Sequence, residues 1–421
     1  MKKFLDLGKV IGKSSIPKQE PKKSIDIPII EKEVSQAKLQ LTNLKNGVKI
    51  LTESSTFPGN VIIGAAFKSG TRNESAPETL RSIKLIHNLS HSPQASDYLQ
   101  QLGSDISISY SEEFTSFYTK SLSYNTKKLS KVLYDSIFLE YDSNLQEVLQ
   151  KKLKNFYSKN LDFMEFVEKN ILFHCFKQNP ANLKEKIQIR ELNNHVQSFH
   201  TSGNLCIFAG GVYNHFEFVD LVSGYFKDLP ETEELVLEPY AFDPKTVNVM
   251  QDLPFGCYSI CVPGESWGSD QFWVQKLLSD LVSSTFSQAQ SDFPYVSEVF
   301  SNSYFYSDTG LFVITFIAPP EYLSKSMSFF NTLLEKVLKI SPEEFNTIKQ
   351  QFKLNYFLSS ENHEQRLLKT VQKFLLTKKL EDTKSVFSEI DKVKIEDLAN
   401  MVERFLGSKS VYFNIGPGFS R

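Results

Sequence analysis

Apolar and polar positions early in the chain predict strands that end at turn residues. The strands are expected over Leu39–Leu44, Val48–Thr52 and Val61–Phe67. Asn46-Gly47 separates the first two runs, and because this dipeptide readily adopts positive φ angles it predicts a hairpin. Pro77 suits the first turn of a helix, since the N–H that proline lacks is unsatisfied there anyway. Pro93 predicts that this helix ends near His91.

A second succession of elements occurs twice and indicates an internal repeat. In the first half a strand at Phe117–Ser123 precedes predicted helices at Val132–Phe138, 144–158 and 162–177. In the second half a strand at Leu311–Ile317 precedes a helix that ends at Leu338 and helices at 342–357 and 361–377. A Leu-Ser-Lys triplet follows each strand, at Leu129–Lys131 and at Leu323–Lys325.

The two halves also end in the same way. A helix with Val196 and Phe199 precedes the apolar strand Leu205–Ala209. A helix with Val402 and Phe405 precedes the apolar strand Val411–Ile415. The shared order of strand, helices and closing strand predicts an α+β fold built from two copies of a unit of about 200 residues.

The predicted boundary between the copies is acidic and rich in proline. Residues 228–246 hold six acidic side chains and three prolines, which favour an extended, solvated linker. We therefore expect a basic tail at 1–37, a first domain at 38–227, this linker, and a second domain at 247–421. Few core contacts are expected to cross the linker.

Composition excludes several classes of protein. The chain has 47 basic and 49 acidic side chains, a net charge of −2, so no overall positive charge favours nucleic acid. Its longest apolar runs are about half or less of the ~20 residues that a membrane-spanning helix needs. The four cysteines form no CxxC pair, which argues against a disulfide framework or a cysteine zinc site. Seven lysines and two acids in residues 1–23 leave two interpretations open, an atypical mitochondrial targeting segment or a flexible tail.

Isolated chemical groups give little support for catalysis. The sequence contains neither a Gly-x-Ser-x-Gly nucleophile elbow nor a phosphate-binding loop. His174-Cys175 lies in an apolar helix and is expected in a core or interface, because His and free Cys are often buried without a catalytic role. His195 and His200 flank a helix end and are expected to be solvated. Trp267 and Phe272-Trp273 could anchor an interface, but core packing is the preferred interpretation.

Three short motifs resemble the M16 metallopeptidase family. Leu44–Val48 is similar to the family's opening hairpin, Lys68–Glu74 to its Gly-Ser-Arg-x-Glu strand end, and Tyr306–Phe312 to its Tyr-Ser-Asp-Thr-Gly-Leu-Phe segment. The resemblance extends over most of residues 38–418. It implies two duplicated M16-like domains, each with a mostly antiparallel sheet packed against helices.

Active M16 members carry His-x-x-Glu-His on the helix after the Gly-Ser-Arg motif. Two histidines there bind zinc, and the glutamate acts as general base for the attacking water. Without a gap, the five positions fall on Ile83–His87, so that only His87 matches and the base position is Ile86. A further glutamate ligand falls on Lys152, whose ammonium has no lone pair for zinc. The resemblance therefore predicts no catalytic residue, no metal site and no cofactor site.

A displaced histidine pair offers a rival interpretation. His87 and His91 are spaced i and i+4, so they share one helix face, with Ser90 at the glutamate place. An active zinc peptidase would need a third ligand and a usable base, which these residues do not supply. We therefore favour the interpretation that both histidines are polar residues near a helix end.

Non-catalytic members of the family set the functional expectation. They include core protein 2 of the mitochondrial cytochrome bc1 complex (complex III) and the α subunit of the processing peptidase, which handles substrates with a glycine-rich loop. The matching region, Leu278–Phe293, contains no glycine and could instead form a serine-rich loop. The resemblance thus implies a structural core subunit on the matrix side of the inner membrane, which supports electron transfer from ubiquinol to cytochrome c. Its implied partners are a second M16-like core subunit, cytochrome b and cytochrome c1, with the α-type peptidase subunit as the alternative.

Overall fold

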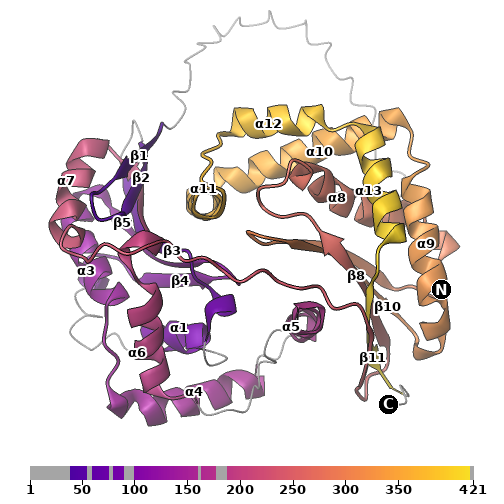
Figure 1. Cartoon of the computed structure of the whole chain (residues 1–421), viewed down its shortest axis with the longest axis horizontal. Helices are drawn as coiled ribbons and strands as arrows, with labels where there is room; N and C mark the ends of the chain where they lie inside the picture. The colour runs from indigo at the N-terminus through magenta and orange to yellow at the C-terminus, as the bar shows by residue number, and fades with distance from the viewer. Residues whose placement is uncertain are drawn as a thin grey trace, which may run out of the picture. The chain divides into compact units, whose positions relative to one another are not determined.

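The computed structural model describes residues 38–54, 59–74, 79–89, 99–159, 163–176 and 187–417. All of them belong to a unit that extends from Ala37 to Arg421. Two sheets organise this unit, one from each half of the chain (Figure 1). The α+β fold class with two mostly antiparallel sheets, predicted from the sequence, is confirmed.

The first sheet has the strand order β1-β2-β6-β3-β5-β4. Its strands are β1 (Leu39–Asn43), β2 (Lys49–Ser54), β3 (Asn60–Phe67), β4 (Ile106–Tyr110), β5 (Thr115–Leu122) and β6 (Leu205–Val212). All neighbours are antiparallel except β2 and β6, which run parallel. The predicted hairpin is confirmed: β1 pairs with β2, and Gly47 takes a φ of 89° in the turn.

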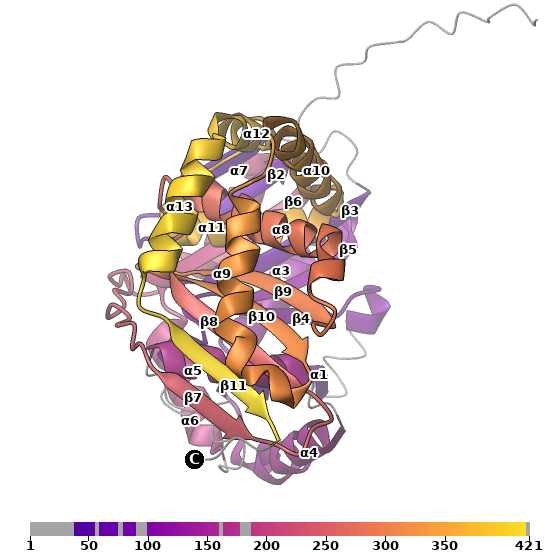
Figure 2. The ribbon, with the colours of Figure 1, turned by 90° about the vertical axis from the view of Figure 1, so that its right-hand side faces the viewer.

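The second sheet has the strand order β7-β11-β8-β10-β9. Its strands are β7 (Thr246–Met250), β8 (Gly256–Gly264), β9 (Glu298–Phe305), β10 (Gly310–Ala318) and β11 (Val411–Gly416). Here the opening strand β7 runs parallel to the closing strand β11, as β2 does to β6 in the first sheet. Apart from the extra strand β1, the two sheets therefore share one topology (Figures 1 and 2).

The helices also follow a common order. In the first half they are α1 (Thr79–Leu89), α3 (Thr126–Ile137), α4 (Gln146–Lys159), α5 (Phe163–Phe176), α6 (Ile189–Phe199) and α7 (His215–Phe226). In the second half they are α8 (Phe272–Gln288), α9 (Ser326–Val337), α10 (Pro342–Glu361), α11 (His363–Thr377), α12 (Thr383–Lys392) and α13 (Ile395–Gly407). By their place between strands, α8 is the counterpart of α1, α11 of α5 and α13 of α6.

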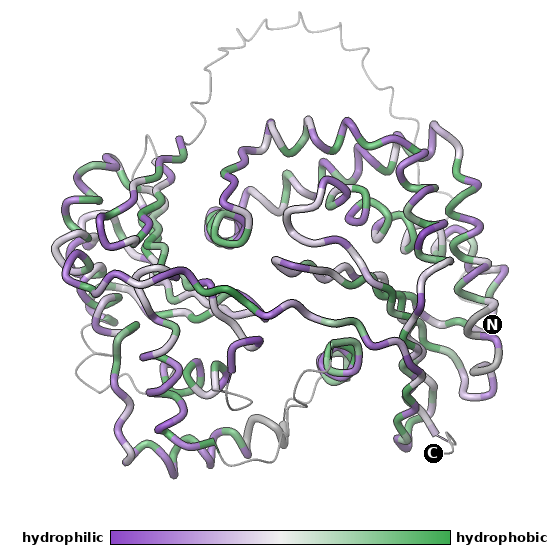
Figure 3. Tube along the Cα trace, viewed as in Figure 1, coloured by the Kyte–Doolittle hydropathy of each residue, from purple (hydrophilic) through white to green (hydrophobic). Residues whose placement is uncertain are grey.

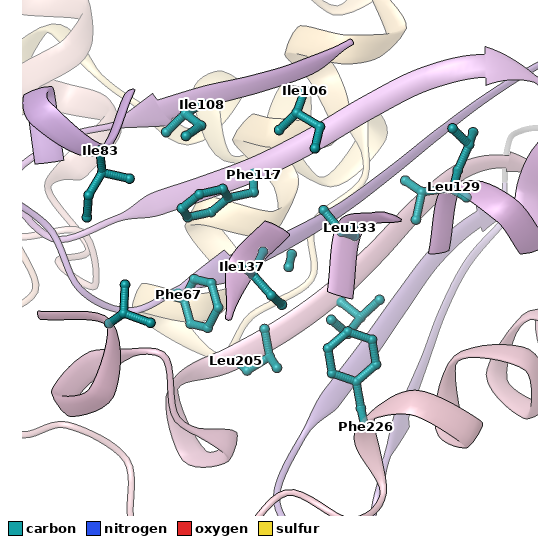
Figure 4. Close-up of a cluster of buried hydrophobic side chains, with 14 of the residues drawn as sticks. Phe67, Ile83, Ile106, Ile108, Phe117, Leu129, Leu133, Ile137, Leu205 and Phe226 are labelled. Atoms are coloured by element: carbon teal, nitrogen blue, oxygen red, sulfur yellow. The ribbon is translucent and has the colours of Figure 1, made fainter. Parts of the chain in front are cut away.

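One face of each sheet packs against helices of its own half. In the first half, alternate residues of β3 and β5 meet α1 and α3, with Phe67, Phe117 and Leu133 at the centre (Figure 4). In the second half, Phe312 and Phe316 of β10 pack against α8, α9 and α13. The interpretation of Phe272 and Trp273 as core-packing residues is confirmed, because Phe272 is buried and Trp273 packs against this core.

The other face of each sheet packs against a helix from the opposite half. α5 places Val167, Ile171 and Leu172 on the second sheet, against residues such as Val313 and Phe413.

α11 places Leu367, Val371 and Leu375 on the first sheet, against residues such as Ile62 and Phe208. The halves have exchanged counterpart helices, so the expectation of few core contacts across the linker is wrong. Buried residues accordingly follow one another along β10, and Figure 3 shows hydrophobic stretches within the second sheet.

Two further expectations are corrected. Most of the predicted serine-rich loop is the buried helix α8, in which Ser279 donates a 2.7 Å hydrogen bond to the carbonyl of Ser301. The Leu-Ser-Lys triplets are not equivalent, because Leu129–Lys131 lies inside α3 whereas Leu323–Lys325 precedes α9. By contrast, Val196 and Val402 are both buried on counterpart helices, as the repeat predicts.

Candidate functional site

The helix that would carry the zinc motif is α1, and its motif positions are largely apolar and packed. Ile83 and Ile86 are buried in the core of the first half, with Ile86 only 2% exposed at the position of the general base. Lys84 lies over the ring of Tyr110, with its Nζ 5.7 Å from the ring centroid. A hydrocarbon side chain at the base position cannot accept a proton from water.

His87, the one matching residue, faces the core. Its Nε2 lies 3.0 Å from the hydroxyl oxygen of Tyr141, and its ring packs edge-on against Phe117. Ser90 and His91 lie outside the described residues. Lys152, at the position of the later glutamate ligand, is exposed on α4. Within the described ranges, no group of three or more His, Cys, Asp or Glu side chains is arranged to hold a metal ion.

His195 and His200, expected to be solvated, are instead buried at 2% and 4% exposure. The ring of His200 stacks on Phe67 at a centroid distance of 4.1 Å, and its Nδ1 lies 2.6 Å from the carbonyl oxygen of Ile137. Burial lowers the pKa of His195 to about 3 and that of His200 to about 4. Both rings are therefore neutral near pH 7.

The two motifs from opposite halves meet in an ionic cluster around the buried carboxylate of Glu113. The guanidinium of Arg72, whose side chain is 4% exposed, forms salt bridges with Glu113 and with Asp308 of the second half. Both Arg72–Asp308 hydrogen bonds measure 2.8 Å, which is the geometry of a bidentate pair. The Arg72 guanidinium also stacks over Tyr240 at 3.6 Å. We call Arg72, Glu113, Tyr240, Ser307 and Asp308 the motif clamp.

Hydrogen bonds satisfy the carboxylates of the motif clamp. The backbone N–H and hydroxyl of Ser307 donate to Glu113 at 2.7 and 2.9 Å, and the backbone N–H of Tyr240 donates to Asp308 at 2.8 Å. Burial raises the pKa of Glu113 in spite of these bonds. Burial also opposes ionisation of Asp308, but the hydrogen bonds from Arg72 and Tyr240 lower its pKa overall. The cluster is thus a contact between the two halves in which both carboxylates are hydrogen-bonded.

Further polar contacts hold α11 to the first half. Arg366 donates to the buried carboxylate of Glu53 on β2. The hydroxyl of Tyr118 on β5 donates a 2.9 Å hydrogen bond to Glu364. In the linker, Glu234 receives salt bridges from Lys68 at 2.8 Å and from Lys378 at 2.6 Å. The linker is therefore anchored to both halves, although it contains no helix or strand between residues 230 and 245.

His174 and Cys175 lie on the face of α5 that meets the second sheet. Cys175 is fully buried, and the ring of His174 lies 5.7 Å from that of Phe413 on β11. The interpretation of this pair as a core or interface feature is confirmed. Sequence reasoning missed that Arg72 and Asp308 are partners, although both stand in recognised motifs. The one sequence signal for the exchange of helices was the continuous apolar runs. A strand covered on both faces has such a run, whereas a strand with one solvated face alternates apolar and polar residues.

The described helices include none that is both long enough and apolar enough to cross a membrane.

The chain is similar in sequence to known proteins. Residues 186–352 match the Peptidase M16 inactive domain. A probable mitochondrial-processing peptidase β subunit from Arabidopsis thaliana is 20% identical over 91% of this chain and 79% of its own. A cytochrome b-c1 complex reductase subunit from Candida albicans is 21% identical over 86% of this chain and 87% of its own.

Solved structures share the fold. A protease from Helicobacter pylori superposes with a TM-score of 0.78 at 14% identity, over 91% of this chain and all of that one. A chain of complex III from Candida albicans superposes with a TM-score of 0.75 at 17% identity, over 90% of this chain and 96% of that one. The resemblance that the sequence motifs indicated is confirmed: residues 186–352 match the Peptidase M16 inactive domain, and the similar proteins include bc1 complex subunits.

Proposed function

We propose that this chain is a catalytically inactive core subunit of the mitochondrial bc1 complex, similar to core protein 2, and that it has a structural role in electron transfer from ubiquinol to cytochrome c. The observation that carries the proposal is the buried Ile86 at the position of the general base. Zinc hydrolysis needs a proton acceptor at that point, and an isoleucine packed in a core cannot supply one.

Similarity to bc1 subunits supports this role. It extends over 86% of the chain for the Candida albicans subunit and over 90% for the chain of complex III. In the proposed assembly the chain pairs with a second M16-like core subunit and contacts cytochrome b and cytochrome c1. It lies on the matrix side of the inner membrane and does not itself span the bilayer.

The proposal includes a domain division. We assign one domain to residues 38–227 and one to residues 247–421, joined by the linker at 228–246. The repeated strand order supports this division. Each domain nevertheless supplies a helix to the other, so the two are expected to fold as one cooperative unit.

Native mass spectrometry after gentle detergent extraction tests the proposal. A tagged full-length chain is expected to copurify with a second M16-like subunit, two cytochrome subunits and haem absorbance. Recovery of the chain in a soluble pair without haem would contradict it. Metal analysis of the purified chain provides an independent check, because stoichiometric, tightly bound zinc would refute the inactive assignment.

A second candidate is the substrate-binding α-type subunit of a mitochondrial processing peptidase. The similarity to a processing peptidase α subunit from Caenorhabditis elegans over 88% of the chain favours it. The same purification separates the two candidates, since a haem-free heterodimer that cleaves mitochondrial presequences only when both chains are present would support the peptidase.

A further inference from the structure

Two neighbouring turns of the first half expose large aromatic side chains. Tyr124 is 79% exposed, Tyr213 77% and Phe216 68%, and these are the most exposed aromatic residues in the described part of the chain. Leu122 beside them is 48% exposed. We call these four residues the aromatic edge. Single exposed apolar residues are ordinary, but a group of them at one place indicates an interaction surface.

Strand pairing brings the two turns together. Leu122 ends β5 opposite Asn60, which begins β3. The backbone of β6 closes on the same residue, because a Cβ on Gly211 would lie only 2.1 Å from the carbonyl oxygen of Asn60. Tyr124 follows Leu122 by two positions and Tyr213 follows Gly211 by two, so both turns lie where β3, β5 and β6 meet at one edge of the sheet.

The helices that follow the two turns start at the same edge. α3 begins just after Tyr124, and α7 begins just before Phe216. The two helices pack along each other, with the rings of Tyr134 and Tyr225 6.0 Å apart. Figure 1 shows α3 and α7 against the same sheet. The residues of the aromatic edge therefore all stand on turns or helix starts at one edge of the first sheet.

Exposed lysines lie on the side of the aromatic edge that β5 and α3 form. Lys120, Lys127, Lys128 and Lys131 are exposed, and residues 114–134 contain no acidic side chain. Lys120 is paired with Glu364, but no described carboxylate forms a salt bridge with the three lysines of α3. On the other turn, Glu217 and Asp220 of α7 supply two negative charges. The side of the edge formed by α3 thus has a local excess of positive charge.

Tyrosine, phenylalanine and leucine with lysines on one side match the chemistry of a bilayer surface. Aromatic rings insert at the headgroup level, while lysine stems extend so that their ammonium groups meet anionic phosphates. We propose that the aromatic edge is a peripheral contact site for anionic lipid bilayers. This proposal does not depend on the proposed subunit role, because it concerns a surface of the chain alone.

A second exposed apolar stripe supplies the matched control. On α10, Leu354, Phe357 and Leu358 are 55%, 49% and 51% exposed. The nearest lysine along this helix, Lys353, is already paired with Asp391. The stripe is likewise exposed and apolar but lacks the lysines of the aromatic edge, and it is expected to contribute nothing to binding of an anionic bilayer.

Vesicle sedimentation of the full chain tests the proposal. Binding is expected with phosphatidylcholine vesicles that contain phosphatidylglycerol, and it should weaken as salt is raised. The triple variant Tyr124→Ser, Tyr213→Ser and Phe216→Ser is expected to bind about tenfold more weakly, because bilayer affinity scales with inserted apolar area. Lys127→Glu with Lys128→Glu should reduce the preference for phosphatidylglycerol.

The control variant Leu354→Ser with Phe357→Ser is expected to bind as the wild type does. All variants keep the basic residues 1–23, so any loss of binding comes from the altered surface. Circular dichroism and thermal unfolding verify that each variant is folded. Unchanged binding in the edge variants, equal loss in the α10 control, or no binding by the wild-type chain would each overturn the proposal. Loss of a copurified protein with vesicle binding intact would also overturn it.

Discussion

The two halves of the molecule share a strand order but not the chemistry of their cores. The first half buries His87, His195, His200 and His215 beside aromatic rings, whereas the helices and strands at the centre of the second half are packed with phenylalanine and leucine. Six of the seven histidines lie before residue 216. A repeated topology therefore constrains where strands and helices lie, but it leaves the polarity of each core free to differ.

Both halves depend on each other in the same way. One face of each sheet is covered by helices of its own half, and the other face is covered by a helix from the opposite half. This reciprocity makes the interface between the halves a part of both cores. Stability of one half should therefore respond to substitutions in the other.

The largest effect is expected where the halves meet in the motif clamp. Arg72→Ala leaves the buried carboxylate of Glu113 without its charged partner, and it should lower the free energy of unfolding by about 3–5 kcal/mol. Urea unfolding measures the loss. Adding Glu113→Gln should recover part of it, because the unpaired charge is then gone. Lys392→Ala, which breaks an exposed pair with Glu389, is the control and should cost about 0–0.5 kcal/mol. Equal losses for Arg72→Ala and this control would show that the clamp does not join the halves.

The exchanged helices should show reciprocal effects. Leu172→Ala on α5 and Leu375→Ala on α11 each truncate a buried helix side chain that packs against the sheet of the opposite half. Each should lower the free energy of unfolding by about 2–5 kcal/mol. Hydrogen exchange should show lost protection in β8 and β11 for the first variant and in β3 and β6 for the second. Leu354→Ala, at an exposed site, should stay within about 0.5 kcal/mol of the wild type. Protection lost only in the half that carries the substitution would contradict the exchange.

Acid should weaken the first half more than the second. The pKa of His195 falls from 6.5 to about 3 on folding and that of His200 to about 4, so the folded state binds fewer protons. The stabilisation is complete above the unfolded pKa of 6.5 and is lost progressively as the pH falls toward the folded values. Near pH 5 each histidine should cost about 2 kcal/mol.

Urea unfolding near neutral pH and near pH 5 measures this loss. His195→Leu should reduce the acid sensitivity, since one of the two most strongly shifted histidines is removed. Phe405→Leu, a substitution in the second core, should leave the pH dependence unchanged although it lowers stability. An unchanged pH dependence in His195→Leu would assign the acid sensitivity to other groups.

The smallest effect concerns the one strand of the first sheet without a counterpart in the second. Gly47 holds a positive φ in the β1–β2 hairpin, so Gly47→Ala should cost about 1 kcal/mol through backbone strain. Gly224→Ala in α7 is the control and should raise the stability. No heavy atom lies within 4 Å of an added Cβ there, and alanine favours helix over glycine. Thermal unfolding should show the two shifts in opposite directions.

Local patterns in the sequence predicted the elements well but the contacts between them poorly. Asn46-Gly47 specified its hairpin and the apolar runs specified β3 and β10, because these signals depend on neighbours in sequence. The buried state of His195 and His200 was not predictable in this way, since polarity alone favours a solvated position and only tertiary packing overrides it. The serine content of Leu278–Phe293 misled for the same reason, because the leucines and Phe286 of α8 decide its burial.

Sequence motifs located the residues of the candidate site along the chain but did not predict their contacts. Counting from Gly70 placed Ile86 at the base position, and the structure places that residue in the core. The meeting of Arg72 with Asp308 needed three dimensions, because 236 positions separate them. The order of the two motifs along the chain gave no indication that their side chains are in contact.

The exchange of helices has a consequence for how the chain is made. β6, which completes the first sheet, ends at Val212, but the helix that covers this sheet's second face extends to Thr377. During synthesis from the N-terminus, Ile62, Phe208 and their neighbours must therefore stay uncovered until most of the second half has left the ribosome. An apolar sheet face exposed for that time is a binding surface for chaperones and a source of aggregation. Newly made chains are thus most prone to aggregation after the first half has left the ribosome and before α11 has.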